Sequence, residues 1–413
     1  MDIVTLLIDR LRAGQFAEIS GMFPPNLQSL VPPEAIRAAW QAEIDRQGAV
    51  SAFGAPLSEP AGAAGTLVRV PVTFAGGAAT VLATIAGDRV TSLQIAGPEA
   101  AQPTQEWQPP EYADPAALSE EDVLIGDGPL AVPGTLTLPA GPAIVAAVVL
   151  LAGSGPLDRD ETIGRNKPFK DLAWGLATRG IATVRFDKVT FAKPAGVAKI
   201  AGFTVDDEYL HHALAAVDLL RHRPGVDPAR IFVLGHSLGG SVAPRVAAAD
   251  RAVAGLVILG GGAQPMHWSA VRQFRYLGSP QQLLDSVTRQ AEAVDSPDLS
   301  PATPVADLPF GVPASYWLDL RGYDPAAAAA ALGKPMLILQ GGRDYQATVD
   351  DDLARWRAAL GDHPGVTIRI HDADNHFFFA GSGPSKPAEY ERAQHVDPAV
   401  VTDISHWIQE EPS

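Results

Sequence analysis

The chain has 413 residues, of which 46% are apolar, and this length and composition are typical of a globular protein with roughly two or three domains. Its formal net charge of -16 at pH 7 argues against a nucleic-acid or anionic-membrane partner, and no long basic run offsets that charge. The lack of cysteine excludes disulfides, thiolate metal sites and a cysteine nucleophile.

The beginning of the chain carries no recognisable export signal. Its first ten residues lack both a basic start and a sufficiently long apolar core, so we expect a cytoplasmic protein. The longest apolar stretch, residues 143–152, is far shorter than the ~20 residues that a membrane helix needs. We therefore read it as a buried strand and expect no membrane partner.

Residues 1–98 have the pattern of a small α+β domain. Apolar residues recur at helical spacing near the start, and Pro32-Pro33-Glu34 opens a second helix. Strand-like runs follow at 66–74, 79–85 and 89–95. Helices followed by a curled antiparallel sheet resemble the cone of nuclear-transport-factor-like domains, which implies an accessory domain.

Residues 99–115 form a proline-rich linker, which we expect to be a semi-extended spacer. Residues 116–413 follow as one larger domain. Two antiparallel strands, at 122–126 and 134–138, precede a series of strands that alternate with helices. Such alternation predicts a mostly parallel sheet that is covered by helices on both faces.

A glycine-rich loop follows the apolar run 144–151 and reads Ala152-Gly153-Ser154-Gly155-Pro156. A backbone N–H in such a loop is suited to binding the negative charge that develops on a substrate oxygen. We predict the N–H of Ser154 as one donor of this oxyanion hole. The alternative is a turn without a catalytic part.

The pentapeptide Gly235-His236-Ser237-Leu238-Gly239 follows a short apolar strand and precedes a helix of small residues. A serine at a sharp strand-to-helix turn presents its hydroxyl outward, and the flanking glycines permit the tight backbone. We predict that Ser237 is a nucleophile. The N–H of Leu238, directly after it, is the second predicted oxyanion donor.

An insertion at about 264–333 separates two strand patterns, and its helical periodicity predicts a cap over the serine. Aromatic side chains in and after the insertion are candidates for contacting substrate, although such residues also form the core of a cap. The candidates are Trp268, Tyr316, Trp317 and Phe377.

The acid and the base are predicted downstream of the serine. Asp344 follows the buried strand pattern 335–340, and His376 lies in the loop after the pattern 366–370. The order serine, acid, histidine, each after a separate strand, is the order of a catalytic triad on a parallel sheet. Asp372 and Asp374 remain rival acids.

The chain resembles α/β-hydrolase-fold serine esterases, specifically a bacterial subgroup with the oxyanion loop G-S-G-P-x-D-R-D, here residues 153–160. The resemblance covers about residues 115–410. It implies hydrolysis of small carboxylic esters by a Ser-Asp-His triad, with no metal and no organic cofactor. Relatives often have histidine where this chain has Ala152. We expect the charged residues of the loop, Asp158 to Asp160, to form ion pairs that shape it.

The expected reaction is acyl transfer to water through an acyl-enzyme on Ser237. The same groups can cleave amides or peptides, or pass the acyl group to another acceptor as an acyltransferase or cyclase. A binding scaffold without catalysis is the remaining alternative. The sequence does not indicate the oligomeric state.

Overall fold

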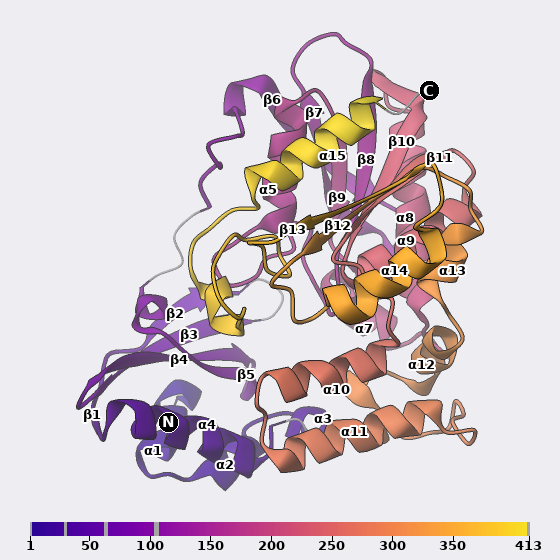
Figure 1. Cartoon of the computed structure of the whole chain (residues 1–413). Helices are drawn as coiled ribbons and strands as arrows, with labels where there is room; N and C mark the ends of the chain where they lie inside the picture. The colour runs from indigo at the N-terminus through magenta and orange to yellow at the C-terminus, as the bar shows by residue number, and fades with distance from the viewer. Residues whose placement is uncertain (1, 29–30, 62–64, 103–106, 411–413) are drawn as a thin grey trace.

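A computed structural model gives the fold of residues 2–28, 31–61, 65–102 and 107–410 (Figure 1). Within these residues the strands form two separate sheets, one in residues 50–96 and one in residues 118–371. Each sheet has its own hydrophobic core. The separate cores agree with a small α+β unit followed by a larger α/β unit.

The smaller unit starts with helices and continues with an antiparallel sheet. The helices are α1 (Ile3–Arg12), α2 (Phe16–Gly21), α3 (Pro25–Gln28) and α4 (Pro33–Gln47). The strands are β1 (Val50–Phe53), β2 (Leu57–Pro60), β3 (Thr66–Phe74), β4 (Gly77–Ala86) and β5 (Arg89–Ala96). They pair in the order β1-β3-β4-β5, with β2 on β3. Leu7 and Leu11 lie one helical turn apart in α1, and Val68 and Val70 are alternate residues of β3. All four are buried in the same core, so one face of the helix packs on one face of the sheet.

The segment between the two units makes contacts on both sides. Arg69 of β3 donates through Nη1 to the backbone oxygen of Ala100 over 2.9 Å. Farther along, Trp107 donates through its indole N–H to Asp171 over 2.7 Å, which attaches it to the larger unit. Residues 103–106 of the predicted linker lie outside the described residues.

The larger unit is built on a sheet whose strands run in the order β13-β12-β11-β10-β8-β9-β7-β6. From β13 to β9 the pairs are parallel, whereas β7 and β6 are antiparallel to their neighbours. The strands are β6 (Leu118–Ile125), β7 (Val132–Pro139), β8 (Val145–Leu151), β9 (Ala182–Phe186), β10 (Val226–His236), β11 (Val253–Leu259), β12 (Met336–Gly341) and β13 (Val366–His371).

Helices cover both faces of this sheet, as the near-continuous apolar strands predict. On one face, Val148 and Leu150 of β8 pack with α5 (Pro168–Thr178) and α15 (Pro398–Glu410). On the other face, Val149 of β8 packs with α8 (Val205–Arg221), α9 (Leu238–Ala249) and α14 (Ala354–Leu360). Each fully buried Val or Leu contributes about 1.5–3 kcal/mol, so both faces stabilise the sheet. Short helices α6 (Val189–Ala192) and α7 (Pro194–Val197) follow β9.

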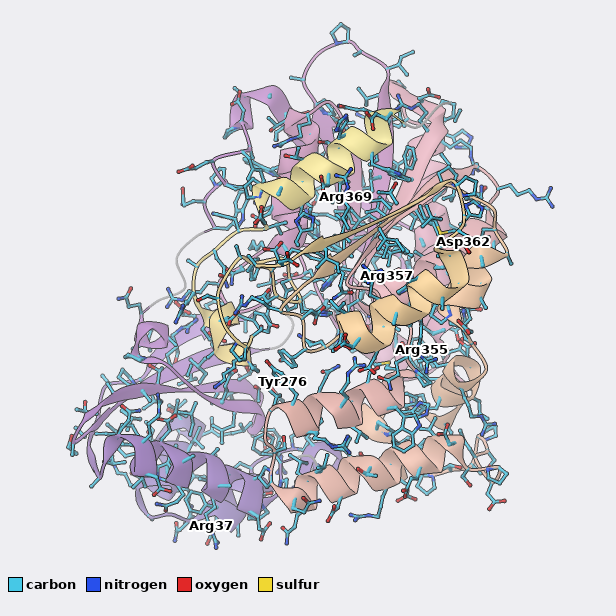
Figure 2. All side chains as sticks on the ribbon, viewed as in Figure 1. Arg37, Tyr276, Arg355, Arg357, Asp362 and Arg369 are labelled. Carbon is cyan, nitrogen blue, oxygen red and sulfur yellow. The ribbon has the colours of Figure 1, made fainter. Side chains whose placement is uncertain are left out.

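The chain between β11 and β12 forms a helical insertion with small cores of its own. Its helices are α10 (Met266–Tyr276), α11 (Gln281–Asp295), α12 (Ala314–Arg321) and α13 (Pro325–Ala330). Val271 of α10 and Val287 of α11 share one of these cores. Tyr276 at the end of α10, labelled in Figure 2, stacks on Tyr345 of the body with ring centroids 4.8 Å apart. Every helix in the described residues is too short or too polar to span a bilayer.

Candidate active site

Adjacent strands bring the predicted reacting groups to one edge of the larger sheet. Ser237 follows β10, Asp344 follows β12 and His376 lies in the loop after β13. Because the carboxyl ends of parallel strands meet at the same edge, these three residues converge there. Strand β11 lies between β10 and β12 and ends at Leu259. A Cβ added to the next residue, Gly260, would lie 3.3 Å from Asp344 Oδ2. Gly260 therefore leaves room for the Asp344 side chain.

Ser237 occupies a strained turn, with φ 53° and ψ -121°. Its N–H donates to the Leu259 oxygen over 2.9 Å, which fixes the turn against β11. A Cβ at Gly235 would lie 2.2 Å from the Gly239 oxygen, and one at Gly239 would lie 2.2 Å from the Leu151 oxygen. Only glycine fits at either position, so the two glycines permit the turn that presents the Ser237 side chain.

Asp344 and His376 form a buried pair. His376 Nδ1 lies 2.7 Å from Asp344 Oδ2, and both side chains are almost fully buried. The other carboxylate oxygen, Oδ1, accepts from the backbone N–H groups of Gln346 and Ala347 over 2.7 and 3.0 Å. Because Asp344 accepts at both oxygens, His376 donates from Nδ1, which leaves Nε2 available as a proton acceptor.

The rival acids lie in other surroundings. Asp372 is exposed, whereas Asp374 is fully buried. Burial raises the pKa of Asp374 to about 7, and the neighbouring Asp397 carboxylate adds to the rise. The nearest histidine nitrogen recorded for Asp374 is His371 Nδ1, at 4.0 Å from Oδ2. The geometry thus favours Asp344 as the partner of His376.

The Ser237 hydroxyl makes no hydrogen bond to His376 among the described residues. Such bonds are often long in ligand-free sites and shorten when substrate binds. The two residues are nevertheless coupled through His236, which directly precedes Ser237. The His236 ring centroid lies 4.6 Å from that of His376, and Phe377 packs on both rings.

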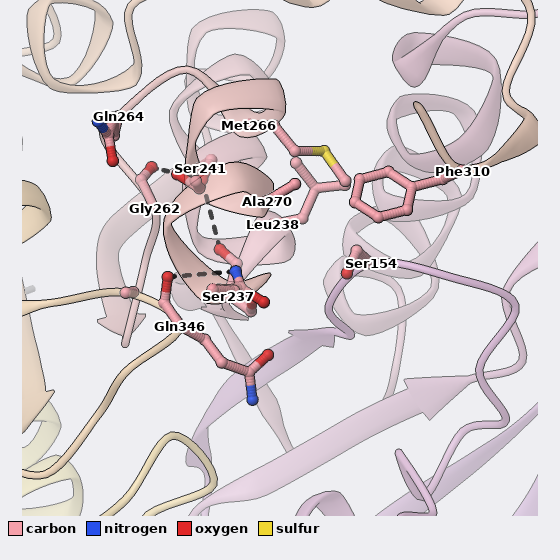
Figure 3. A pocket seen from close by; sticks show the side chains of 13 residues that line it. Ser154, Ser237, Leu238, Ser241, Gly262, Gln264, Met266, Ala270, Phe310 and Gln346 are labelled. Atoms are coloured by element: carbon pink, nitrogen blue, oxygen red, sulfur yellow. Dashed lines mark hydrogen bonds between the residues drawn. The ribbon is translucent and has the colours of Figure 1, made fainter. Parts of the chain in front are cut away.

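The two predicted oxyanion donors line one cavity with Ser237 (Figure 3). Leu238 is the first residue of α9, where a backbone N–H has no acceptor within the helix. The Ser154 N–H likewise has no acceptor in the part of the chain that the structure describes. Both N–H groups are therefore available to a ligand.

Two charged residues of the loop after β8, Arg159 and Asp160, form ion pairs with residues outside the loop. Arg159 bonds Asp187 through its side chain, with Nε 3.0 Å from Oδ1, and through its backbone N–H. Asp160 pairs with Arg185 at 2.8 Å and with Lys167 at 2.7 Å. These contacts agree with the predicted ion pairs for Arg159 and Asp160. Asp158 forms no ion pair in the described structure and instead accepts hydrogen bonds from the backbone N–H and the hydroxyl of Thr162.

A second buried pair, which the sequence analysis did not identify, joins this loop to the serine turn. Glu161 Oε1 accepts from the Gly153 N–H over 2.6 Å and lies 2.9 Å from His236 Nδ1. On its other side, His236 Nε2 lies 2.9 Å from the backbone oxygen of His376. Three separate segments are thus tied together behind Ser237. The only sequence signal was the position of His236 beside Ser237, the predicted nucleophile.

The cavity at Ser237 is small, with a volume of about 90 Å³. Figure 3 shows Phe310, Met266 and Ala270 of the insertion on its walls. Polar side chains complete the lining, namely Gln264, Ser269, Gln273 and Gln346.

The four aromatic residues predicted to contact substrate lie away from this cavity. Trp317 is fully buried in the core of the insertion, and Trp268 donates to Asp295 on α11. Tyr316 is buried, and its hydroxyl donates to Glu208 over 2.6 Å. Phe377 packs behind the site on His236. Their apolar surface is thus used in packing.

Among the described residues, no group of three histidine, aspartate or glutamate side chains is arranged to hold a metal ion. The carboxyl end of the parallel strands instead brings together the Ser237 hydroxyl and the hydrogen-bonded pair of His376 and Asp344. Such a set can activate an oxygen nucleophile.

Comparisons with known proteins show what the chain is similar to. It is 37% identical over 309 residues to Esterase EstD of Thermotoga maritima, covering 73% of this chain and 70% of that protein. It is 29% identical over 150 residues to the 2,6-dihydropseudooxynicotine hydrolase of Paenarthrobacter nicotinovorans, covering 36% and 37% of the two chains. The solved structure of Est1E from Butyrivibrio proteoclasticus matches 70% of this chain and 98% of its own, with 16% identity and a TM-score of 0.47. No protein-family model matches the chain.

The first of these similarities extends over most of both proteins. Together with the sheet topology, it confirms the predicted fold class, an α/β-hydrolase fold with a helical insertion and a small preceding α+β unit. The chain belongs to the family of Esterase EstD and is a carboxylesterase-type hydrolase with the α/β-hydrolase fold.

Proposed function

We propose that this hydrolase cleaves carboxylic esters through an acyl-enzyme on Ser237, with His376 as the base and Asp344 as the acid that orients it. The observation that carries the proposal is the buried His376–Asp344 pair, with Nδ1 2.7 Å from Oδ2, beside a serine on a strained turn. This pair leaves His376 Nε2 free to take the serine proton.

Each step then has a group to perform it. Ser237 Oγ attacks the ester carbonyl carbon while His376 Nε2 accepts its proton. The N–H groups of Ser154 and Leu238 bind the resulting oxyanion. As the intermediate collapses, the C–O bond to the alcohol breaks and His376 protonates the leaving alcohol. Water, deprotonated by His376, attacks the acyl-enzyme, and the carboxylic acid leaves as the proton returns to Ser237.

The size of the cavity favours esters whose acyl group is small. A volume of about 90 Å³ has room for a few non-hydrogen atoms, and Phe310 and Met266 border it. The polar side chains in the lining favour a substrate with hydrogen-bonding groups near the ester. The small unit of residues 1–98 and the linker 99–115 are proposed as accessory to the catalytic domain 116–413, with the insertion 264–333 as its cap.

A serine-directed phosphonate tests the nucleophile. We expect one adduct per chain, located at Ser237 by peptide mass spectrometry, and no ester hydrolysis by Ser237→Ala. Ser405→Ala is the matched control, because that serine is buried in α15 and donates only to the Thr402 oxygen. An adduct elsewhere, or wild-type turnover in Ser237→Ala, would overturn the proposal.

A further inference from the structure

The backbone oxygen of Gly153 is held by two buried side chains. Lys188 Nζ donates to it over 2.8 Å and Tyr209 donates through its hydroxyl over 2.7 Å. Lys188 follows β9 and Tyr209 lies on α8, and both are at least 97% buried, with exposures of 3% and 2%. Two donors from different elements thus converge on one carbonyl group next to the serine.

That carbonyl and the Ser154 N–H belong to the same peptide group. A trans peptide is planar, so its N–H points away from its C=O, and fixing one direction fixes the other. We propose that Lys188 and Tyr209 are positioning residues that orient and polarise the Gly153–Ser154 peptide, so that its N–H faces the substrate oxyanion. This inference rests on the proposed function, in which Ser154 supplies one oxyanion donor.

The other side of Gly153 is fixed as well. Its own N–H donates to Glu161 over 2.6 Å, so the peptide before it is also held. A Cβ at this position would lie 3.1 Å from Ser237 Cβ, which shows how closely the loop approaches the nucleophile. With both flanking peptides bonded, the Ser154 N–H has little freedom to turn away from the cavity.

The two donors have the protonation states that the role requires. Burial raises the pKa of Tyr209 well above its ordinary value, and the Glu208 carboxylate adds to the rise, so the hydroxyl keeps its proton. Burial lowers the pKa of Lys188, while Glu208, whose Oε1 lies 3.1 Å from Nζ, opposes that change. An amine donates a hydrogen bond in either charge state. Donors on a peptide oxygen strengthen its N–H as a donor, because hydrogen bonds in a chain polarise one another.

Neither residue lines the cavity at Ser237, so neither is placed to touch the substrate there. The Tyr209 hydroxyl also lies 3.0 Å from the backbone oxygen of Ala152, so an effect on the reaction passes through the peptide groups of this loop. Tyr209→Phe removes one donor and keeps the ring, and Lys188→Met removes the other with similar length. Tyr323→Phe is the matched control, because its hydroxyl donates over 2.8 Å to a different backbone oxygen, that of Ser241. All three variants are first compared with wild type for folding by circular dichroism.

The readout is the ratio of kcat/KM for an oxoester to that for the matched thionoester. Sulfur accepts hydrogen bonds weakly, so the ratio reports the strength of the oxyanion donors. Removing one such donor elsewhere costs about 10²–10³ in kcat, and misorienting it should cost less. We expect Tyr209→Phe and Lys188→Met to lower the ratio about 10-fold or more, and Tyr323→Phe to leave it unchanged.

The carbonyl stretching frequency of the acyl-enzyme provides a second measurement. Weaker donors polarise the acyl carbonyl less, so the band should shift to higher frequency in Tyr209→Phe. A folded Tyr209→Phe with the wild-type ratio and the wild-type band would overturn the inference. If wild type formed no acyl-enzyme on Ser237 by mass spectrometry, the proposed function itself would fail, and the two failures are therefore distinguishable.

Discussion

His236 Nε2 donates to the backbone oxygen of His376 over 2.9 Å, so the residue before Ser237 holds the loop that carries His376. The other ring nitrogen of His236 faces Glu161 at 2.9 Å. One proton is therefore on Nε2 and another is shared with Glu161. Burial opposes a charge on the ring, but the Glu161 carboxylate outweighs it, and the pKa of His236 is raised above its ordinary value.

Glu161→Gln should remove a stabilisation that depends on pH. A histidine whose folded pKa is raised above the unfolded value, about 6.5, stabilises the fold fully below that pH. The contribution is then lost as the pH rises through the folded pKa. We expect the unfolding free energy of wild type minus that of Glu161→Gln to be largest between pH 5 and 6.5 and to decrease above it. Urea denaturation from pH 5 to 9 measures this difference, and a constant value would contradict the ion pair.

His236→Phe should slow the chemistry. Phenylalanine keeps the packing on Phe377, where the ring centroids are 5.0 Å apart, but loses both hydrogen bonds. A shift of the base by about 1 Å costs on the order of 10²-fold in rate, so we expect kcat to fall about 10–100-fold with KM nearly unchanged. Single-turnover acylation kinetics measure it. His371→Phe is the comparison, because His371 contacts Asp403 and not the serine turn. Equal losses in the two variants would indicate a general effect on packing.

Asp344→Asn should reduce kcat by up to about 10⁴-fold. The amide oxygen of asparagine would accept from the Gln346 and Ala347 N–H groups, as Oδ1 does now. Its NH₂ group would then face His376 Nδ1 and favour the tautomer that carries the proton on Nε2. That tautomer cannot accept the serine proton. Steady-state kinetics of Asp344→Asn, Asp372→Asn and Asp374→Asn decide between the three acids, and a large loss confined to Asp374→Asn would contradict our assignment.

Asp374→Asn should stabilise the protein as the pH rises. The pKa of Asp374 is raised to about 7 by burial, against about 3.9 in the unfolded chain. Between these values the folded state keeps a proton that the unfolded chain has released, so wild type loses stability as the pH increases. The unfolding free energy of Asp374→Asn minus that of wild type should increase from pH 4 to 7, to at most about 4 kcal/mol. Above pH 7 this difference should stay constant. Thermal unfolding across this range measures it, with the exposed Asp372→Asn as a control that should show no such trend.

Phe310→Ala should broaden the range of acyl groups. Because the cavity has a volume of about 90 Å³, we expect wild-type kcat/KM to be highest for acetate to butyrate esters and to fall with longer chains. Each methylene in such a pocket changes transition-state binding by about 1–3 kcal/mol. Phe310→Ala should move the optimum to longer chains in a p-nitrophenyl ester series. Trp268→Ala should not, since Trp268 contacts Asp295 on the outer helix. A shift in Trp268→Ala alone would support the aromatic pocket predicted from the sequence.

The sequence predicts those parts of the fold that depend on short-range patterns. Continuous apolar runs indicated the strands before Ser237 and Asp344, because buried parallel strands require apolar side chains on both faces. Alternation of apolar and polar residues indicated the strand before His376, which is only half-buried at the edge of the sheet. Short strands were missed. The strands Val50–Phe53 and Leu57–Pro60 have four residues each and lie among Gly54, Pro56 and Pro60, so neither shows a clear alternation.

Contacts between distant segments were beyond sequence reasoning. Glu161 and His236 are 75 positions apart, and nothing in the local pattern of either residue indicates the other. For the aromatic candidates, the local pattern indicates burial but does not indicate what the buried side chain contacts. Helical periodicity places Tyr316 and Trp317 on a buried face, but a buried face of a cap can contact its own core or the cavity, and only the packing distinguishes these. The assignment of roles to Ser237, Asp344 and His376 stays a prediction.

The order of the strands also determines when activity can appear during synthesis. The serine turn and the loop of His376 lie 140 positions apart, and Asp344 comes between them. At about 5–20 residues per second, roughly 7–28 s pass between the synthesis of the two segments. A ribosome-bound chain therefore carries Ser237 well before it carries His376. On the proposed mechanism, the nascent chain cannot hydrolyse esters until β13, an edge strand, has joined the sheet.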